Sequence, residues 1–337
     1  MKICVCGGGN LGLVCAGFLG AQKGVELSVF TRNPSLWESG LEVVDPNQKV
    51  FFATPLVISS EAKDVVFGSD IVLLCLPGFA IESTLNEIKP YVSNNTIVGS
   101  IVCSTGFFFA AHRILADNVP LFGFQRVPFI ARTIEYGHKA NLLGYKAELC
   151  IAVEGIENRE GFRERIEKLF LTPTRLLNSF YEASLTNSNP ILHTGRLYSM
   201  WQNWDGEVYR QPVLFYKEWT DEASQLVLDM DAEFMQLVKA LGMTRSAIPS
   251  LLEYYESTDA SSLTRKIRSI PAFESILAPM KEVDNGWIPD FSSRYFTEDF
   301  PYGLKIIHDL MISHSLYEEN INTVLSWGLK KCECLSK

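Results

Sequence analysis

The chain has 337 residues, of which 47% are hydrophobic and 20% charged, and its formal net charge is −9. This composition is typical of a globular protein of about two domains, and the excess of acidic residues argues against nucleic acid or an anionic membrane as a partner. The apolar runs fall short of the ~20 residues that cross a bilayer. None of the eight cysteines forms a C-x-x-C pair, so the sequence indicates a reduced, cytoplasmic protein without a metal site.

A glycine-rich turn comes almost at the first residue. The apolar run 2–6 is expected to form a strand, residues 7–12 read Gly-Gly-Gly-Asn-Leu-Gly, a small-residue helix follows, and a second apolar run covers 27–30. This order of strand, glycine turn, helix and strand is the context of a dinucleotide-binding fingerprint. The glycines permit the tight turn, the approach of a pyrophosphate and close packing of the helix, whose free N–H groups bind phosphate. The predicted cofactor contacts in this turn are Gly7, Gly9, Asn10, Leu11 and Gly12.

The end of the second strand indicates which nucleotide binds. NAD-preferring sites usually place Asp or Glu there, on the ribose 2′-hydroxyl. This chain has Thr31 and Arg32 instead, and Glu26 lies too early, at the start of the strand. A hydroxyl and a guanidinium match a 2′-phosphate. The sequence therefore favours NADP(H) over NAD(H); the alternative is that Arg32 is only a solvated turn residue.

Alternating strands and helices continue to about residue 175. Buried strands at 70–76 and 96–103 end at Leu76-Pro77 and before Ser104. Strand-to-helix turns of a parallel sheet lie at its carboxyl edge, where ligands bind, so Leu76, Pro77 and Ser104 are further predicted cofactor contacts. The pattern predicts an α/β fold, with a Rossmann-type doubly wound parallel sheet in an N-terminal domain over residues 1–178.

Residues 179–337 are helical in pattern. Apolar residues recur at helical spacing over 221–241, 247–256, 261–277 and 302–331, and no run of buried strands is evident. The sequence therefore predicts an all-α C-terminal domain that carries the substrate and catalytic residues. The exposed faces of these helices are compatible with a homodimer.

Two stretches of this domain, 187–198 and 294–304, contain residues suited to reductive chemistry. Histidine is the usual proton donor, a carboxylate beside it fixes its tautomer, and arginine binds a substrate carboxylate. The candidates for these roles are His193, Asp299 and Arg294. From the residues alone, His193 is equally well explained as an interior or capping histidine, Asp299 as the acidic start of a helix, and Arg294 as a surface charge.

The whole chain resembles the opine dehydrogenases, the octopine/nopaline dehydrogenase family. The resemblance rests on the glycine turn, on Asn189-Pro190 with His193, and above all on the stretch 294–303, which reads Arg-Tyr-Phe-Thr-Glu-Asp-Phe-Pro-Tyr-Gly. It implies that His193 donates and accepts the proton, that Asp299 orients it, and that Arg294 contacts the substrate carboxylate. Further predicted substrate contacts in the same domain are Asn189, Arg196 and Tyr198.

The reaction that the resemblance implies is a reductive condensation. An amino acid and a 2-oxo acid such as pyruvate form an imine, which the nicotinamide reduces to give an N-(carboxyalkyl) amino acid. One alternative is a 2-oxo acid reductase of the ketopantoate reductase type, although such enzymes use a lysine as proton donor. Another alternative is a non-catalytic NADP(H)-binding sensor protein. No sequence motif of the helical domain identifies the amino-acid substrate.

Overall fold

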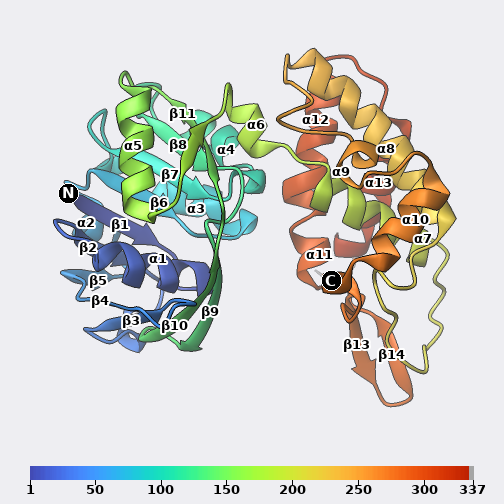
Figure 1. Cartoon of the computed structure of the whole chain (residues 1–337), viewed down its shortest axis with the longest axis horizontal. Coiled ribbons are helices and arrows are strands. Elements are labelled where there is room, and N and C mark those ends of the chain that lie inside the picture. The colour runs from blue at the N-terminus through green and yellow to red at the C-terminus, as the bar shows by residue number, and fades with distance from the viewer. Residues whose placement is uncertain (334–337) are drawn as a thin grey trace. The chain divides into compact units, whose positions relative to one another are not determined.

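The computed structural model describes residues 1–333, which fall into two compact units that divide between Ser184 and Leu185 (Figure 1). The sequence predicts the division at 178/179, a few residues earlier. Among the described residues, no helix combines the length and the apolar character that a membrane span requires.

The N-terminal unit is built on an eight-stranded sheet with the order β12-β11-β8-β7-β6-β1-β2-β5. All neighbours in this sheet are parallel except β8 and β11. Its strands are β1 (Lys2–Cys6), β2 (Glu26–Phe30), β5 (Val57–Ser59), β6 (Ile71–Leu74), β7 (Ile97–Ile101), β8 (Leu121–Phe124), β11 (Leu149–Glu154) and β12 (Thr174–Leu176). The predicted α/β fold is confirmed, with an antiparallel pair near one edge.

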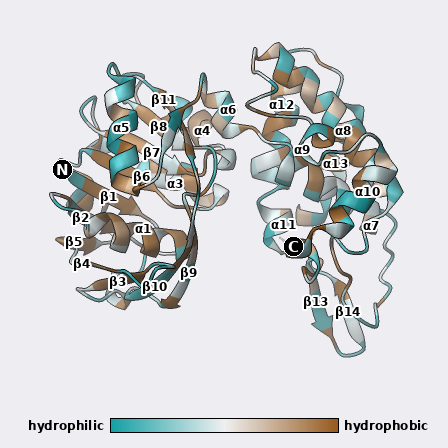
Figure 2. Ribbon diagram, viewed as in Figure 1, coloured by the Kyte–Doolittle hydropathy of each residue, from teal (hydrophilic) through white to brown (hydrophobic). Residues whose placement is uncertain are grey.

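The two faces of this sheet support two separate hydrophobic cores. Ile3 and Val5 of β1 pack into one core, whereas Cys4 and Cys6 pack into the other, because successive side chains of a strand point to opposite faces. Helices α1 (Asn10–Gly20) and α5 (Arg159–Phe170) bury residues in the first core. Helices α2 (Ala62–Val65), α3 (Gly78–Ile88), α4 (Phe107–Ile114) and α6 (Phe180–Ser184) contribute to the second. Burial on both faces explains the continuous apolar strands, and Figure 2 shows the hydrophobic character of β1 and α1.

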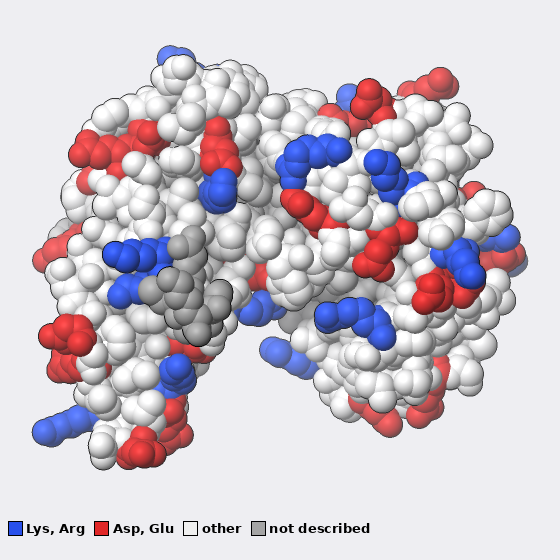
Figure 3. All heavy atoms as spheres, turned by 180° about the vertical axis from the view of Figure 1, so that it is seen from behind, with Lys and Arg blue, Asp and Glu red and all other residues white. Residues whose placement is uncertain are grey.

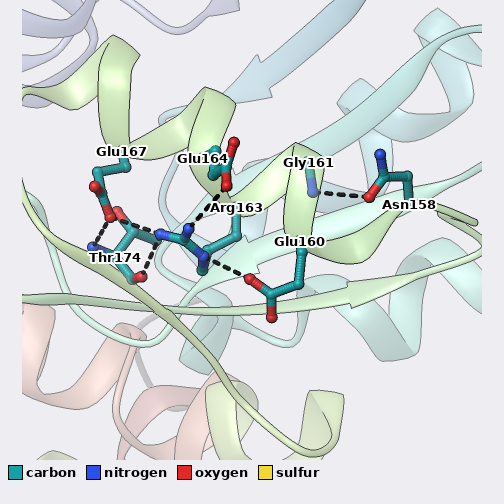
Figure 4. A network of polar contacts seen from close by, with 7 residues as sticks. All are labelled: Asn158, Glu160, Gly161, Arg163, Glu164, Glu167 and Thr174. Carbon is teal, nitrogen blue, oxygen red and sulfur yellow. Dashed lines mark hydrogen bonds and ion pairs between the residues drawn. The ribbon is translucent and has the colours of Figure 1, made fainter.

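Helix α5 is fixed to the edge strand β12 by polar contacts (Figure 4). The Asn158 side chain caps the helix by accepting a hydrogen bond from the Gly161 N–H at 2.9 Å. Arg163 pairs with Glu160 and Glu167 and also donates to the carbonyl oxygen of Thr174, at 3.2 Å. Thr174 N–H in turn donates to Glu167 at 3.0 Å. The cap and this network set where the helix begins and where β12 lies.

A second, four-stranded sheet with the order β4-β3-β10-β9 packs against α1. Its strands are β3 (Leu41–Val44), β4 (Val50–Ala53), β9 (Phe129–Glu135) and β10 (Lys139–Tyr145). Phe18 of α1 packs against Phe51 and Phe129, with ring centroids 4.7 and 5.1 Å apart. The sequence pattern does not predict β9 and β10. These strands pair with two shifts in register, which interrupt the regular alternation of apolar and polar residues along them.

The C-terminal unit is mainly helical, as predicted. Helix α8 runs through it, and Val227, Met230, Phe234 and Leu237 on this helix are fully buried. The side chain of Thr220 caps α8 by accepting from the Ala223 N–H. The helices of this unit are α7 (Thr194–Trp201), α8 (Asp221–Ala240), α9 (Leu251–Tyr254), α10 (Ala260–Ser269), α11 (Arg294–Thr297), α12 (Lys305–Ser313) and α13 (Glu319–Glu333).

Two features of the C-terminal unit differ from the sequence pattern. The helix predicted over 302–331 is two helices, because the chain turns between α12 and α13. At the start of α13, the Glu233 carboxylate of α8 accepts hydrogen bonds from the backbone N–H groups of Asn320 and Ile321, both at 2.9 Å. This carboxylate caps the new helix start. In addition, β13 (Met280–Val283) and β14 (Gly286–Pro289) form an antiparallel hairpin in the unit that was expected to be all-α.

Lys and Arg side chains are interspersed with Asp and Glu on the face shown in Figure 3. Exposed ion pairs include Lys266–Glu256 and Lys305–Asp309, both at 2.6 Å. Such exposed pairs each contribute little to stability. They show how the many surface charges of the chain are partly compensated locally.

Candidate active site

A cavity of about 630 Å³ lies at the carboxyl ends of β1, β2 and β6 in the N-terminal unit. This edge of a parallel sheet is where nucleotides bind in doubly wound folds. The predicted cofactor contacts that line the cavity are Gly7, Gly9, Thr31, Arg32, Leu76 and Pro77. Lining residues that the sequence did not single out are Cys6, Gly8, Phe30, Asn33, Ser60, Cys75, Phe79, Ala80, Ser83, Thr84, Glu87 and Tyr136.

The glycine turn has the shape that a dinucleotide requires. Gly7 has a φ of +117°, and a Cβ at this position would lie 2.6 Å from the Cys75 carbonyl oxygen. A Cβ on Gly12 would overlap the Gly7 carbonyl, so this glycine lets α1 pack closely on the turn. A Cβ on Gly9 would meet no atom within 4 Å, which leaves the backbone open to a ligand. The residues present therefore fit a pyrophosphate at the start of α1.

Four predicted cofactor contacts do not line this cavity: Asn10, Leu11, Gly12 and Ser104. The Asn10 side chain instead accepts a hydrogen bond from the Thr133 N–H of β9 at 2.9 Å, which ties the glycine turn to the second sheet. Ser104 lies in the short helical turn that follows β7. Gly12 acts through packing, and that role of the third glycine of the fingerprint is the predicted one.

The end of the cavity that is lined by the residues after β2 and β5 is polar. Thr31, Arg32 and Asn33 follow β2, and Ser60 follows β5. No carboxylate stands at the end of β2, since Glu26 is its first residue. Tyr136, from the turn between β9 and β10, closes over the glycine turn, so that a Cβ on Gly8 would lie 2.5 Å from its hydroxyl oxygen. The sequence carries no local signal for Tyr136, because it reaches the site through the pairing of distant strands.

In the C-terminal unit, His193 and Asp299 meet. His193 Nδ1 lies 2.8 Å from Asp299 Oδ2, although 106 positions separate the two residues. His193 ends a π-helical turn (Ser188–His193) that leads into α7, and Asp299 precedes a second such turn (Phe300–Leu304) that leads into α12. Both side chains are 14% exposed, so they are shielded but not sealed from solvent.

The hydrogen bonds of His193 determine its tautomer. A carboxylate only accepts, so Nδ1 carries the proton that is donated to Asp299. The other nitrogen, Nε2, lies 2.9 Å from the hydroxyl oxygen of Tyr216. Tyr295 packs on the imidazole with a ring centroid distance of 4.8 Å. Burial, followed by the negative charge of Asp299, raises the pKa of Tyr295, and burial also raises the pKa of Tyr216, so both phenols are neutral at physiological pH.

The other predicted substrate contacts lie in the same unit. Arg294 is exposed at the start of α11, and Asn189 is exposed in the turn that leads to His193. Tyr198 of α7 is half-buried and packs edge-on against Trp327 at 5.4 Å. Within residues 1–333, none of these three side chains forms a hydrogen bond to His193 or Asp299.

Arg196 differs from the expected substrate contact. It is only 4% exposed, and its guanidinium donates to the carbonyl oxygens of Phe215 and Glu218 at 3.2 and 2.7 Å. Burial lowers the pKa of Arg196 to about 10, which leaves it charged at neutral pH. A guanidinium that is buried and bonded to two carbonyls has a structural role, and the structure favours that role over contact with a substrate.

No group of three or more His, Cys, Asp or Glu side chains within the described part of the chain is arranged to hold a metal ion. The imidazole–carboxylate pair can donate and accept a proton at His193 Nε2, because Asp299 fixes the tautomer of the ring from the Nδ1 side.

Known proteins resemble this chain in both of its units. Residues 176–331 match the family model of the NAD/NADP octopine/nopaline dehydrogenase alpha-helical domain, and residues 3–103 match that of ketopantoate reductase. Octopine dehydrogenase of Mizuhopecten yessoensis is 28% identical over 98% of this chain and 90% of its own length. Tauropine dehydrogenase of Arabella iricolor is 26% identical over 97% of this chain and 90% of its own length.

A solved structure of octopine dehydrogenase with NADH and L-arginine superposes with a TM-score of 0.86 at 26% identity, and it covers 98% of this chain and 89% of that one. The helical-domain match includes both His193 and Asp299, and the matches together extend through both units. The chain belongs to the opine dehydrogenase family and is a pyridine-nucleotide-dependent oxidoreductase that acts on CH–NH bonds.

Proposed function

We propose that this enzyme reductively condenses an amino acid with a 2-oxo acid such as pyruvate, and that it uses NADP(H) in preference to NAD(H). The observation that carries the proposal is the pairing of His193 with Asp299 at 2.8 Å, in a chain whose other unit holds a cavity of about 630 Å³ beside the glycine turn. Octopine dehydrogenase has been solved with NADH and L-arginine and with NADH and pyruvate, which supports the two substrate classes.

The proposed chemistry divides between the substrates and the side chains of the chain. The amine attacks the oxo carbon, and loss of water gives an imine. When bound, the nicotinamide supplies a hydride to the imine carbon. His193 supplies and removes protons at Nε2 while Asp299 stabilises the imidazolium that forms and holds the Nδ1 proton. Arg294, whose guanidinium is exposed and unbonded within residues 1–333, is proposed to bind the oxo-acid carboxylate with two parallel hydrogen bonds.

Preference for NADP(H) is supported by the polar end of the cavity. Thr31, Arg32, Asn33 and Ser60 line the cavity and carry donor groups suited to a 2′-phosphate. The residues directly after β2 include no Asp or Glu to receive a 2′-hydroxyl. Glu87 of α3 also lines the cavity and is available to a ribose hydroxyl.

The proposed reaction is tested by following the oxidation of NADPH and NADH with pyruvate alone, with an amino acid alone and with both. Arginine and a panel of other amino acids serve as amines, and the product is identified by mass. Turnover that requires both substrates is the expected result. Turnover with a 2-oxo acid and no amine would instead support the ketopantoate-reductase-like alternative, with which the N-terminal unit shares a family model.

A cytoplasmic location and a homodimer are further proposals. The seven cysteines within residues 1–333 are all free thiols, as expected in a reducing compartment. Sedimentation of the purified chain would measure its oligomeric state.

A further inference from the structure

Tyr216 contacts the nitrogen of His193 that faces away from Asp299. Its hydroxyl oxygen lies 2.9 Å from Nε2, and its side chain is only 5% exposed. The residue lies in a turn between α7 and α8, in a segment without helical or strand periodicity. The same imidazole is thus held at both ring nitrogens, by a carboxylate on one side and by a phenol on the other.

The direction of each hydrogen bond follows from the chemistry of the groups. Asp299 accepts from Nδ1–H, so in the neutral ring Nε2 has a lone pair and the Tyr216 hydroxyl donates to it. When Nε2 becomes protonated, the hydroxyl rotates and its oxygen accepts instead. Tyr216 therefore satisfies Nε2 in both states of the ring, whereas a residue that could only donate would oppose one of them.

The surroundings of Tyr216 hold its ring in place. The ring is stacked on Phe273, with centroids 4.2 Å apart and an interplanar angle of 18°, and it is nearly parallel to Trp219 at 6.1 Å. The N–H of Phe215, the preceding residue, donates to the Ile276 carbonyl at 2.8 Å. This packing holds the phenol ring beside His193.

Arg196 connects this turn to the helix that follows His193. It lies in the first turn of α7, and its guanidinium donates to the carbonyls of Phe215 and Glu218, on either side of Tyr216. The Leu214 N–H donates to the Glu218 side chain at 2.8 Å and closes the turn. One helix therefore follows the imidazole directly and also carries the side chain that anchors the phenol.

We propose that Tyr216 is a positioning residue of the active site, which with Asp299 fixes the orientation and tautomer of His193, and that Arg196 sets the place of the Tyr216 turn. When protonated His193 gives its Nε2 hydrogen to a substrate, the substrate atom takes the place of the Tyr216 oxygen at Nε2, the Nε2–H bond breaks and the substrate gains the hydrogen. When the product leaves, the Tyr216 hydroxyl donates to Nε2 again. Tyr216 neither gains nor loses a proton in this sequence. The kinetic consequence rests on the proposed function, whereas the orientation of the ring does not.

The test uses the full chain with Tyr216→Phe, which removes one oxygen and keeps the stacked ring. Tyr254→Phe is the matched control, because Tyr254 is 59% exposed on α9 and has no contact with His193. The first measurement is the two-bond 1H–15N spectrum of the ligand-free 15N-labelled protein, in which the His193→Gln variant identifies the His193 signals. We expect the Nε2 resonance to move downfield in Tyr216→Phe, as a nitrogen does when it loses a donor, and to stay in place in Tyr254→Phe.

The second measurement is steady-state kinetics with both substrates. Loss of the hydroxyl should lower kcat about tenfold, the effect of one lost hydrogen bond, while the KM of the 2-oxo acid changes much less. An Nε2 resonance that does not move, or a kcat equal to that of Tyr254→Phe, would overturn the proposal. If the wild-type chain shows no turnover, the proposed function fails, and the spectra still decide whether Tyr216 orients His193.

Arg196→Lys keeps the positive charge but loses the planar guanidinium, whose N–H groups donate to the carbonyl oxygens of Phe215 and Glu218. In the folded variant, the Nε2 resonance should move in the same direction as in Tyr216→Phe, by a smaller amount. An unchanged resonance in a folded Arg196→Lys protein would remove Arg196 from the proposal.

Discussion

Gly303 touches Pro190, and this contact lets the turn that follows Asp299 approach the turn that ends at His193. A Cβ on Gly303 would lie 2.9 Å from Pro190 Cγ and 3.2 Å from its Cβ. The glycine ends the most specific stretch of the sequence, and the structure shows a packing reason for it.

Gly303→Ala should push the two turns apart. We expect a loss of about 1–3 kcal/mol in the free energy of unfolding, because the added methyl has no room. We also expect a lower kcat, because the hydrogen bond between His193 and Asp299 should lengthen. Denaturant unfolding and steady-state kinetics measure the two effects. Gly144→Ala is the control, since its Cβ would meet only Ile130 at an ordinary 3.7 Å. Equal behaviour of the two variants would contradict the packing argument.

Removing either member of the imidazole–carboxylate pair should abolish most of the turnover. His193→Ala and Asp299→Ala are expected to lower kcat by about 10²–10⁴-fold, the usual contribution of a positioned acid–base group. Since the two act as one unit, the double variant should be little worse than His193→Ala. Nucleotide binding, measured by fluorescence titration, should remain because the cavity belongs to the other unit. Additive losses in the double variant would argue for independent roles.

Arg32→Ala should weaken the binding of NADPH by about tenfold or more and leave that of NADH nearly unchanged, since only NADPH carries the 2′-phosphate. The control is Arg165→Ala, which removes an exposed arginine of α5 that does not line the cavity. Calorimetric Kd values for both nucleotides decide the matter. Equal losses for NADPH and NADH would refute the 2′-phosphate role of Arg32.

Arg294→Ala should raise the KM of the 2-oxo acid by about tenfold or more, the effect of losing a charge-assisted pair of hydrogen bonds, with a smaller change in kcat. The substitution removes an exposed side chain at the start of α11, so the Tm should stay that of the wild type. Initial rates over a range of pyruvate concentrations test this. An unchanged KM would assign carboxylate binding to another residue.

Asp231 should make the stability of the chain depend on pH. Its carboxylate accepts from Asn187 Nδ2 at 2.7 Å and from the Leu251 N–H at 2.8 Å, and burial raises its pKa from 3.8 to about 6. The folded chain then binds this proton more readily than the unfolded chain does, so stability should fall as the pH rises from 3.8 to about 6. The contribution is about 1–3 kcal/mol. Asp231→Asn should flatten this part of the pH profile of unfolding, and an unchanged slope would contradict the assignment.

The nucleotide half of the protein could be predicted from the sequence because its signals are local. Continuous apolar runs identify strands that are buried on both faces, and three glycines in one turn mark the start of α1. The pair His193 and Asp299 was suggested by family resemblance, and the structure brings these residues together. The antiparallel partners β9 and β10 escaped prediction because their register is irregular.

Only the tertiary structure shows that Tyr136 lines the cavity, that Tyr216 contacts His193 and that Arg196 is buried against two backbone carbonyls. Tyr136 reaches the glycine turn through strand pairing, and Tyr216 lies in a turn without periodicity that Arg196 anchors from α7. Hydrophobic period and glycine placement are properties of a short segment, so they can be read from it directly. Which side chain faces His193 depends on how segments more than twenty positions apart pack, and no local pattern encodes that packing.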